Sequence, residues 1–441
     1  MPETELLQAG DILVRDLVEP SSGGLVCAVV AGDDLPAVAS HALQILRPLR
    51  PLTRAEQVMT LLYLRSPLAV DLLAANGRGQ SLHVGSLAEL PIPVPDDGLA
   101  SAIEDLDAAA QRLQAWHKEA DEALGTVFTA ADAATARATV VRSGRKVRLK
   151  TDAAMLIDDF AYTLRTRYPH PIAYRWRVVE AKLSSTDQRG DAYAEILEAA
   201  EVLHAYGANV ALALVREAGM TLGATDAVRT KLSSRQNGVS YGDWIAILQE
   251  ACQSKKVKLM AADSPLTDFA SFFGVPEVDE ARSRLKQRRD DHAHQRRLSP
   301  AQLESELAEA YEDLVLVLRA AEFLCDLPLV QAIAVRWDSL SGTSDVAYRE
   351  VMGDHPVVPA RTTEYLGHGL EQDSLYLVDS SHRWHLLRPF LTGRECPRCG
   401  NWSTFHLDRS RNDSVAVKSM EHGHEVADEL LTVPFRSAGL L

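Results

Sequence analysis

The sequence of 441 residues has few cysteines and no long hydrophobic run, and both absences narrow the class of protein. Only five cysteines occur, two of them close together, so a disulfide framework is not expected. No apolar run reaches the roughly 18 residues that a membrane helix requires. The N-terminus has no basic stretch followed by an apolar core, so we expect no secretory signal, no membrane contact and a cytoplasmic location.

The sequence also lacks the short motifs of several enzyme classes. It contains no GxxxxGK[ST] phosphate-binding loop, no HExxH zinc-protease motif and no NPP[YF] methyltransferase tetrad. If the protein serves a modification system, we therefore expect it to do so as an accessory and not as the methyltransferase.

Acidic side chains outnumber basic ones, and their distribution along the chain is uneven. The formal net charge is −15, with 46 Lys and Arg against 61 Asp and Glu. Residues 1–130 contain 8 basic and 18 acidic side chains, and residues 301–441 contain 12 and 22. Residues 131–300, with 26 and 21, are the only basic region, so contact with DNA or RNA is expected there.

The chain is longer than one hydrophobic core usually accommodates, so we predict a multidomain α+β protein. The expected parts are a small α/β domain with a long helix at 1–130, a basic linker at 131–178, a mainly helical bundle at 179–335 and a small β-rich domain at 336–441.

The first part alternates strand-like and helix-like segments. GDILV at 10–14 and GGLVCAVVAG at 23–32 predict strands, and AEQVMTLLYLRSPLAVDLL at 55–73 predicts a helix. The prolines in LAELPIPVP at 87–95 force an extended segment. Residues 99–128 then predict one long helix, with an apolar stripe that could pair with another helix.

This order of segments resembles the second half of a target-recognition domain in Type I restriction specificity subunits, over about residues 6–128. The motifs that carry the resemblance are GDILV, ILRP at 45–48, LLYLRS at 61–66, NGRGQS at 76–81 and LAELPIPVP before a long helix. The resemblance implies a domain that reads a DNA half-site. It also implies that the following helix packs against a partner helix and holds methyltransferase subunits.

Two departures from that family leave alternatives open. About sixty residues usually precede the GDIL-like strand in family members, and here almost none do. The segment is also acidic, whereas a DNA-facing domain should be basic. A relic scaffold, a subunit completed by a separate polypeptide and a surface for a protein partner are therefore alternatives to direct base readout.

Helical periodicity dominates the bundle region. We predict helices at 189–217, 244–252, 279–297 and 300–332, with Ser240 or Asp243 capping the second and Ser299 the fourth. A four- or five-helix bundle follows from this pattern.

The stretch TARATVVRSGRKVRLK at 135–150 is strongly basic and is interrupted by a Ser-Gly pair. It suits a linker or a short hairpin lying against a phosphate backbone, and a solvated linker is the alternative. The candidate nucleic-acid-binding residues are Arg142, Arg145, Lys146, Arg148 and Lys150, together with Arg288 further along the chain.

RRDDHAHQRR at 288–297 and the helices around it resemble the HEPN superfamily of prokaryotic defence and toxin proteins. The superfamily signature, R-x(4–6)-H with a polar residue after the arginine, is matched by Arg289, Asp290 and His294. The resemblance implies a homodimer that cleaves RNA without a metal, through attack of the neighbouring 2′-hydroxyl. It equally allows a domain that only dimerises.

The residue types suit that chemistry. Histidine can move a proton near neutral pH, and arginine is a permanent cation for the developing phosphate charge. Asp290 and His294 share a helix face, but Arg289 and His294 lie about 140° apart around an ideal helix. A second protomer or a frayed helix start would be needed to bring them together. Arg288 and His292 are alternative occupants, and simple salt bridging is the non-catalytic interpretation.

The β-rich region contains CPRC at 396–399, which is typical of half a zinc ribbon. EHGHE at 421–425 supplies the ligands that would complete a site with Cys396, Cys399, His422 and His424, and His406 is a further option. The alternative is a degenerate turn that holds no metal. Structural zinc is thus the one cofactor expected.

Two functions follow as hypotheses. In the first, the protein is a nucleic-acid-directed restriction or anti-phage component whose HEPN-like half is a metal-independent ribonuclease. In the second, it is a non-enzymatic binding and dimerisation subunit that docks a methyltransferase or nuclease partner. The partners expected are DNA or RNA, such enzyme subunits and a second copy of the chain.

Overall fold

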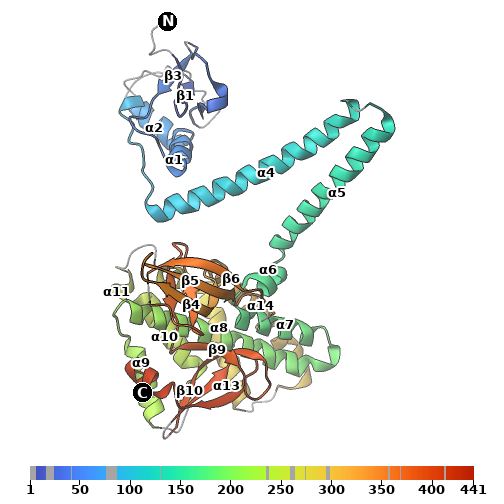
Figure 1. Ribbon diagram of the computed structural model, residues 1–441. Helices are drawn as coiled ribbons and strands as arrows, with labels where there is room; N and C mark the ends of the chain where they lie inside the picture. The colour runs from blue at the N-terminus through green and yellow to red at the C-terminus, as the bar shows by residue number, and fades with distance from the viewer. Residues whose placement is uncertain are drawn as a thin grey trace. The chain divides into compact units, whose positions relative to one another are not determined.

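A computed structural model describes residues 6–15, 24–40, 42–75, 87–129, 131–234, 238–258, 264–273, 275–294, 298–355, 358–367, 369–411 and 414–441 (Figure 1). These residues confirm an α+β protein, with helices and three antiparallel sheets. The chain divides into two compact units, Met1–Thr151 (unit 1) and Asp152–Leu441 (unit 2). Within the described ranges, no helix has both the length and the apolar content needed to cross a bilayer.

Unit 1 begins with a small sheet of order β2-β1-β3 that packs against two helices. The sheet and helices have a common apolar core that includes Ile12, Val14 and Leu64, all nearly inaccessible to solvent. Helix α1 begins with a capping box, in which Thr53 and Glu56 bind each other's backbone N–H groups. The elements are β1 (Ile12–Arg15), β2 (Cys27–Val29), β3 (Leu43–Leu46), α1 (Arg54–Leu64) and α2 (Pro67–Ala75).

Two long helices, α4 (Asp97–Thr129) and α5 (Ala133–Asp158), follow the small sheet. Helix α4 confirms the long helix predicted at 99–128. The structure differs from the predicted linker at 131–178, because most of that segment is helical. Alanine, arginine and lysine are strong helix formers, and one Ser-Gly pair costs too little to interrupt them. The start of α5 is capped by the Asp132 carboxylate, which accepts the Thr135 N–H at 2.8 Å.

The second half of the predicted linker is part of unit 2. It forms α6 (Phe160–Arg167) and α7 (His170–Leu183), and α7 packs along α8 (Arg189–Glu217). Apolar side chains spaced by four residues place one face of this segment in the main core. These buried residues are Leu164, Tyr168, Ile172 and Trp176.

Helix α8, which has the predicted bounds of 189–217, is the central element of unit 2. Figure 1 shows α8 with β4 and β5 on one side and β9 and β10 on the other. A Cβ atom on Gly207 would lie 3.4 Å from Phe269 and 3.5 Å from Leu248, so this glycine permits close helix packing. The surrounding helices are α9 (Gly223–Ser233), α10 (Tyr241–Gln253), α11 (Lys255–Lys258), α12 (Leu266–Phe273), α13 (Pro276–Ala293) and α14 (Pro300–Ala320).

The caps predicted from sequence are present, but one helix end is wrong. Ser240 with Asp243 forms a capping box on α10, and Ser299 forms one on α14. Helix α14 ends at Ala320 rather than near 332, because Pro328 and the Val/Ile-rich residues after it favour a strand.

Two sheets complete unit 2. The five-stranded sheet has the order β6-β5-β4-β7-β8 and the four-stranded sheet the order β12-β11-β10-β9, with antiparallel pairing throughout. The strands are β4 (Leu329–Asp338), β5 (Thr343–Glu350), β6 (Arg361–Leu366), β7 (Leu375–Val378), β8 (Trp384–Leu386), β9 (Leu391–Glu395), β10 (Trp402–Ser410), β11 (Val415–Ser419) and β12 (Glu425–Asp428), followed by α15 (Thr432–Ser437).

The helices and both sheets of unit 2 have one continuous core. Leu212 of α8, Leu377 of β7, Phe405 of β10 and Phe435 of α15 all belong to the same buried cluster. The boundary predicted between 335 and 336 therefore does not separate two compact units in the structure.

Candidate functional site

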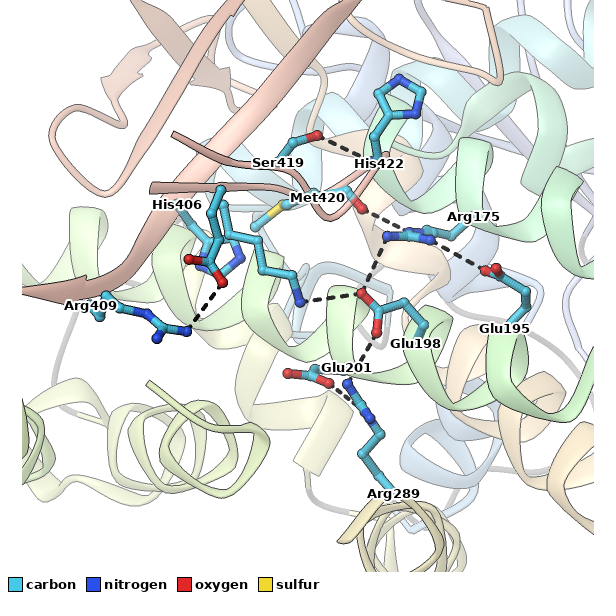
Figure 2. Close-up of polar contacts among 12 residues, drawn as sticks. Arg175, Glu195, Glu198, Glu201, Arg289, His406, Arg409, Ser419, Met420 and His422 are labelled. Atoms are coloured by element: carbon cyan, nitrogen blue, oxygen red, sulfur yellow. Dashed lines mark hydrogen bonds and ion pairs between the residues drawn. The ribbon is translucent and has the colours of Figure 1, made fainter. Parts of the chain in front are cut away.

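Arg289, the arginine of the predicted catalytic motif, points from α13 toward α8. Its Nε donates to the Glu201 carboxylate at 2.6 Å, and its Nη2 donates to Glu198 at 3.1 Å (Figure 2). The Arg289 side chain is 24% exposed. Burial lowers the pKa of Arg289, but the two glutamates outweigh that effect and raise it above its ordinary value. The guanidinium is therefore a charged partner of α8 in this chain.

Glu198 receives two further cations from other elements. The Lys418 ammonium of β11 lies 3.4 Å from its carboxylate. Nη2 of Arg175 from α7 lies 3.3 Å from the same carboxylate (Figure 2). Arg175 also contacts Glu195 at 3.3 Å and donates from Nε to the Met420 carbonyl at 2.7 Å. We call Arg175, Glu198, Glu201, Arg289 and Lys418 the Glu198 network. It connects α7, α8, α13 and β11.

The Glu198 carboxylate is held in its charged form by this network. Burial raises its pKa, but Lys418, Arg175 and Arg289 together outweigh burial and hold the pKa below its ordinary value. The Arg175 side chain is only 8% exposed, so water solvates its charge poorly. The Glu198 carboxylate compensates that charge.

The other two predicted catalytic residues do not join Arg289. The Asp290 carboxylate accepts from Lys286, one turn earlier on α13, at 2.7 Å. His294 is exposed at the C-cap of α13, where its backbone N–H donates to the Asp290 and His292 carbonyls. Within one chain, the Arg289 and His294 side chains therefore do not converge, as expected from their separation of about 140° around the helix axis.

The alternative pair, Arg288 and His292, lines a cavity of about 670 Å³ between α8, α13 and α14. The His292 and Tyr193 rings form a T-shaped pair, with the ring centroids 6.2 Å apart. Arg288 is already bound by three carboxylates of α14, which limits its use for a phosphate. These partners are Glu306 at 2.8 Å, Glu309 at 2.8 Å and Asp313 at 2.6 Å.

The basic residues of α5 have mixed surroundings. Lys146 lies 2.8 Å from the Glu119 carboxylate of α4, and Lys150 contacts the same carboxylate and the Trp116 ring. Arg142 and Arg145 are exposed, and neither has an ion pair within the described ranges. The Arg148 side chain lies outside the described residues. Arg288 belongs to unit 2, so the six predicted nucleic-acid-binding residues do not form one described surface.

GVSYG at 238–242 matches the G-x-S-x-G pattern of a nucleophile elbow. In such an elbow the serine lies in a strained turn between a strand and a helix. Ser240 instead has an extended backbone, with φ of −113°, and its hydroxyl bonds to Asp243 at 2.7 Å. This serine is therefore a helix cap.

Three of the four predicted metal ligands lie together. The ligand atoms of Cys396, Cys399 and His424 are all within 4.8 Å of one another, so this cluster could bind a metal. Cys396 Sγ lies 3.4 Å from His424 Nδ1, close to the spacing of about 3.5 Å across a tetrahedral zinc site with Zn–S near 2.3 Å and Zn–N near 2.0 Å. Gly400, with φ of +74°, lets the CPRC turn close through a 2.8 Å bond to the Cys396 carbonyl.

His422 and His406 have other surroundings. His422 Nδ1 lies 3.2 Å from the Tyr174 hydroxyl of α7, and its ring centroid lies 5.7 Å from that of His424. His406 is buried on β10 with its ring against Trp244. Neither belongs to the cluster of three ligands.

Sequence reasoning missed the Glu198 network, although a signal for it exists. Glu195, Glu198 and Glu201 recur every third residue on α8, whose other side chains are mostly buried and apolar. Three acids in line on such a helix predict buried cations on neighbouring elements. Which cations they would be depends on tertiary structure.

The chain matches no family model, no curated protein and no solved structure at a significant level.

We predict that Glu198→Gln destabilises unit 2 by up to about 3 kcal/mol at neutral pH, because it leaves poorly hydrated cations without their carboxylate. Since the folded-state pKa of Glu198 is lowered, its contribution is present above the unfolded-state pKa and is lost as pH falls through the folded-state value. Urea denaturation at neutral and acidic pH measures the difference. Glu195→Gln, which removes a single contact, is the matched control and should cost less. Equal stability of the Glu198→Gln variant and the wild type at neutral pH would contradict this role.

Proposed function

We propose that the protein is a non-enzymatic binding and assembly subunit of a bacterial restriction-modification or anti-phage defence system. The observation that carries the proposal is the exposed apolar stripe of α4. Leu99, Leu106 and Leu113 recur every seven residues and are 44%, 73% and 60% exposed. A seven-residue repeat of leucine is the pattern by which helices pair in water.

The occupant we assign to this stripe is the α4–α5 hairpin of a second copy. Helix α4 carries seven acidic and two basic residues, whereas α5 carries six basic and two acidic residues. Helix α4 of one copy and α5 of the other would thus attract each other, and the same contact would form twice in a twofold dimer. Helix α5 also exposes Val141 and Leu149, at 53% and 64%.

The resemblance to restriction specificity subunits supports the same function. In that family the corresponding helix packs against a partner helix and holds methyltransferase subunits. The first region would then dock a methyltransferase or nuclease. The engagement of Lys146 and Lys150 by Glu119 favours helix pairing over phosphate contact at those two residues.

The double variant Leu106→Glu/Leu113→Glu should raise the dimer dissociation constant by about a hundredfold or more, because an unpaired charge in an interface costs about 3 kcal/mol or more. Sedimentation equilibrium over a range of protein concentrations measures the constant. Leu62→Glu, at a leucine 59% exposed on α1, is the control and should leave it unchanged. A monomeric wild type, or a double variant that still dimerises, would refute this contact.

A metal-independent ribonuclease is the second candidate, favoured by the cavity that Arg288 and His292 line. His292 would take the proton of the RNA 2′-hydroxyl as its oxygen attacks the adjacent phosphorus. The bond to the 5′-oxygen would break and that oxygen would gain a proton, leaving a cyclic phosphate. Arg288 would face the phosphate only after exchanging one of its three carboxylate partners.

The ribonuclease candidate predicts cleavage of single-stranded RNA or tRNA in EDTA by the wild-type protein. His292→Ala should slow cleavage by at least about a hundredfold, the size of a general acid–base contribution. His294→Ala separates the two motif assignments, because loss of cleavage in that variant alone would favour the Arg289–His294 pair across a dimer. No cleavage by the wild type would leave the binding function as the better account.

We further propose that zinc is the metal held by Cys396, Cys399 and His424. Two thiolates and an imidazole are typical zinc ligands and suit magnesium or calcium poorly. The fourth position would be filled by water, or by His422 after it leaves Tyr174.

The zinc proposal predicts about one zinc per chain by elemental analysis of the purified protein. Cys399→Ser should remove most of it and lower the thermal midpoint, since binding to the folded state adds stability. Cys325→Ser is the control, because Cys325 lies outside the cluster. Retention of zinc in the Cys399→Ser variant would refute this ligand set.

A further inference from the structure

Four strands of the five-stranded sheet contribute aromatic rings to one cluster. Tyr348 of β5, Tyr365 of β6 and Tyr376 of β7 surround Trp384 of β8, with ring centroids 5.4, 6.2 and 5.5 Å from it. The strand registers put all four side chains on the same face, together with Val330 and Val346. This face is distinct from the one that packs on the main core through Leu375 and Leu377.

The aromatic cluster requires the sheet to curl strongly. Strands β6 and β8 are its two edges and lie four strand spacings apart, about 19 Å along a flat sheet. Their rings, Tyr365 and Trp384, are nevertheless 6.2 Å apart. The sheet therefore forms a partly open barrel with aromatic rings inside it.

A cavity of about 330 Å³ opens where this barrel meets the end of α8. Tyr365, Trp384 and Leu370 form its apolar wall, and Arg216 and Arg388 add two guanidinium groups. Tyr365 and Trp384 are half-buried, so part of each ring remains accessible. The cavity thus combines flat apolar surfaces with cations, within the size range of small-molecule sites.

The two arginines of the cavity wall, Arg216 and Arg388, are available to bind an anion. Arg216 is exposed and, within the described ranges, has no ion pair. Arg388 contacts Glu371 through a single 3.1 Å ion pair, in which both side chains are more than 40% exposed, and such pairs exchange partners easily. Among the described residues of the wall, Glu217 is the acidic one, and His385 contacts it at 2.7 Å.

We propose that this cavity binds a nucleobase that carries a phosphate. The base would stack on Trp384 or Tyr365, as bases do on aromatic side chains in proteins that bind single strands. Arg216 and Arg388 would bind the phosphate, for which guanidinium groups are suited. The nucleotide can come from two sources, a free nucleoside phosphate or a single-stranded nucleic acid. A duplex is excluded as the ligand, because its bases are stacked on one another and the cavity has room for one nucleotide.

A cationic ligand fits the same aromatic rings less well. Aromatic cages attract quaternary ammonium groups, but here two guanidinium groups would repel them. The inference does not rest on the proposed assembly function, because the cavity lies in unit 2 and the assembly helices α4 and α5 begin in unit 1.

The test is isothermal titration of the full-length protein with each ribonucleoside monophosphate, with single-stranded oligothymidylate and with choline. Arg216→Gln should weaken nucleotide binding by about tenfold or more, since hydrogen bonds to charged groups contribute at least that factor. Trp384→Leu should weaken it similarly, with circular dichroism to verify the fold. Arg229→Gln, at an exposed arginine of α9, is the matched control and should bind normally.

The outcomes separate the sources. Binding of the oligonucleotide alone would assign the cavity to single-stranded nucleic acid, and binding of monophosphates alone would assign it to free nucleoside phosphates. Binding of both would assign it to nucleotides in general. Binding of choline alone, no binding of any probe, or affinities unchanged by Arg216→Gln would overturn the proposal. The Arg216→Gln result stands even if Trp384→Leu disturbs the barrel, because Arg216 is exposed.

Discussion

The carboxylate of Glu198 is the interaction on which the arrangement of unit 2 depends. A charge on a largely buried helix is stable only when cations compensate it, and here they come from three separate elements, as Arg175, Arg289 and Lys418. These ion pairs thereby fix the positions of helices α7 and α13 and of strand β11 relative to α8. Arg175 also holds the Met420 carbonyl, so the turn that carries His424 is positioned by the same contacts.

This constraint bears directly on function. A catalytic arginine must be free to meet a phosphate, whereas Arg289 already compensates Glu198 and Glu201 and stabilises the fold. Releasing it would take the cation from Glu201 and one of three cations from Glu198, and breaking a buried ion pair costs about 3–5 kcal/mol. Within one chain, Arg289 therefore has a structural role as the partner of Glu198 and Glu201. Arg288 and His292 are the pair that face a cavity, and there the neighbouring acids of α14 determine whether a phosphate can enter.

The sequence predicted those features that depend on local periodicity, such as the bounds of α8 and the Ser240 cap of α10. The CPRC turn and His424 were also expected in one site, because a C-x2-C turn with a later histidine is typical of zinc ligands. The segment predicted as a linker is mostly helical, because helix propensity in α5 and four-residue apolar spacing in α6 and α7 determine its structure despite its charge. The position of His422 against Tyr174 depends on packing between distant segments, which no local pattern encodes.

Two cavities of unit 2 lie at opposite ends of helix α8. One is lined by Gly190 at its start and the other by Arg216 at its end, 26 residues or roughly 39 Å apart at the rise of a helix. A single small ligand cannot occupy both. Their walls also differ in charge, because carboxylates surround Arg288 in the first, whereas Arg216 in the second has no ion pair within the described residues. An anionic ligand should therefore prefer the second cavity, so the end of α8 farthest from the RRDDHAHQRR motif is the better candidate for contact with a nucleotide.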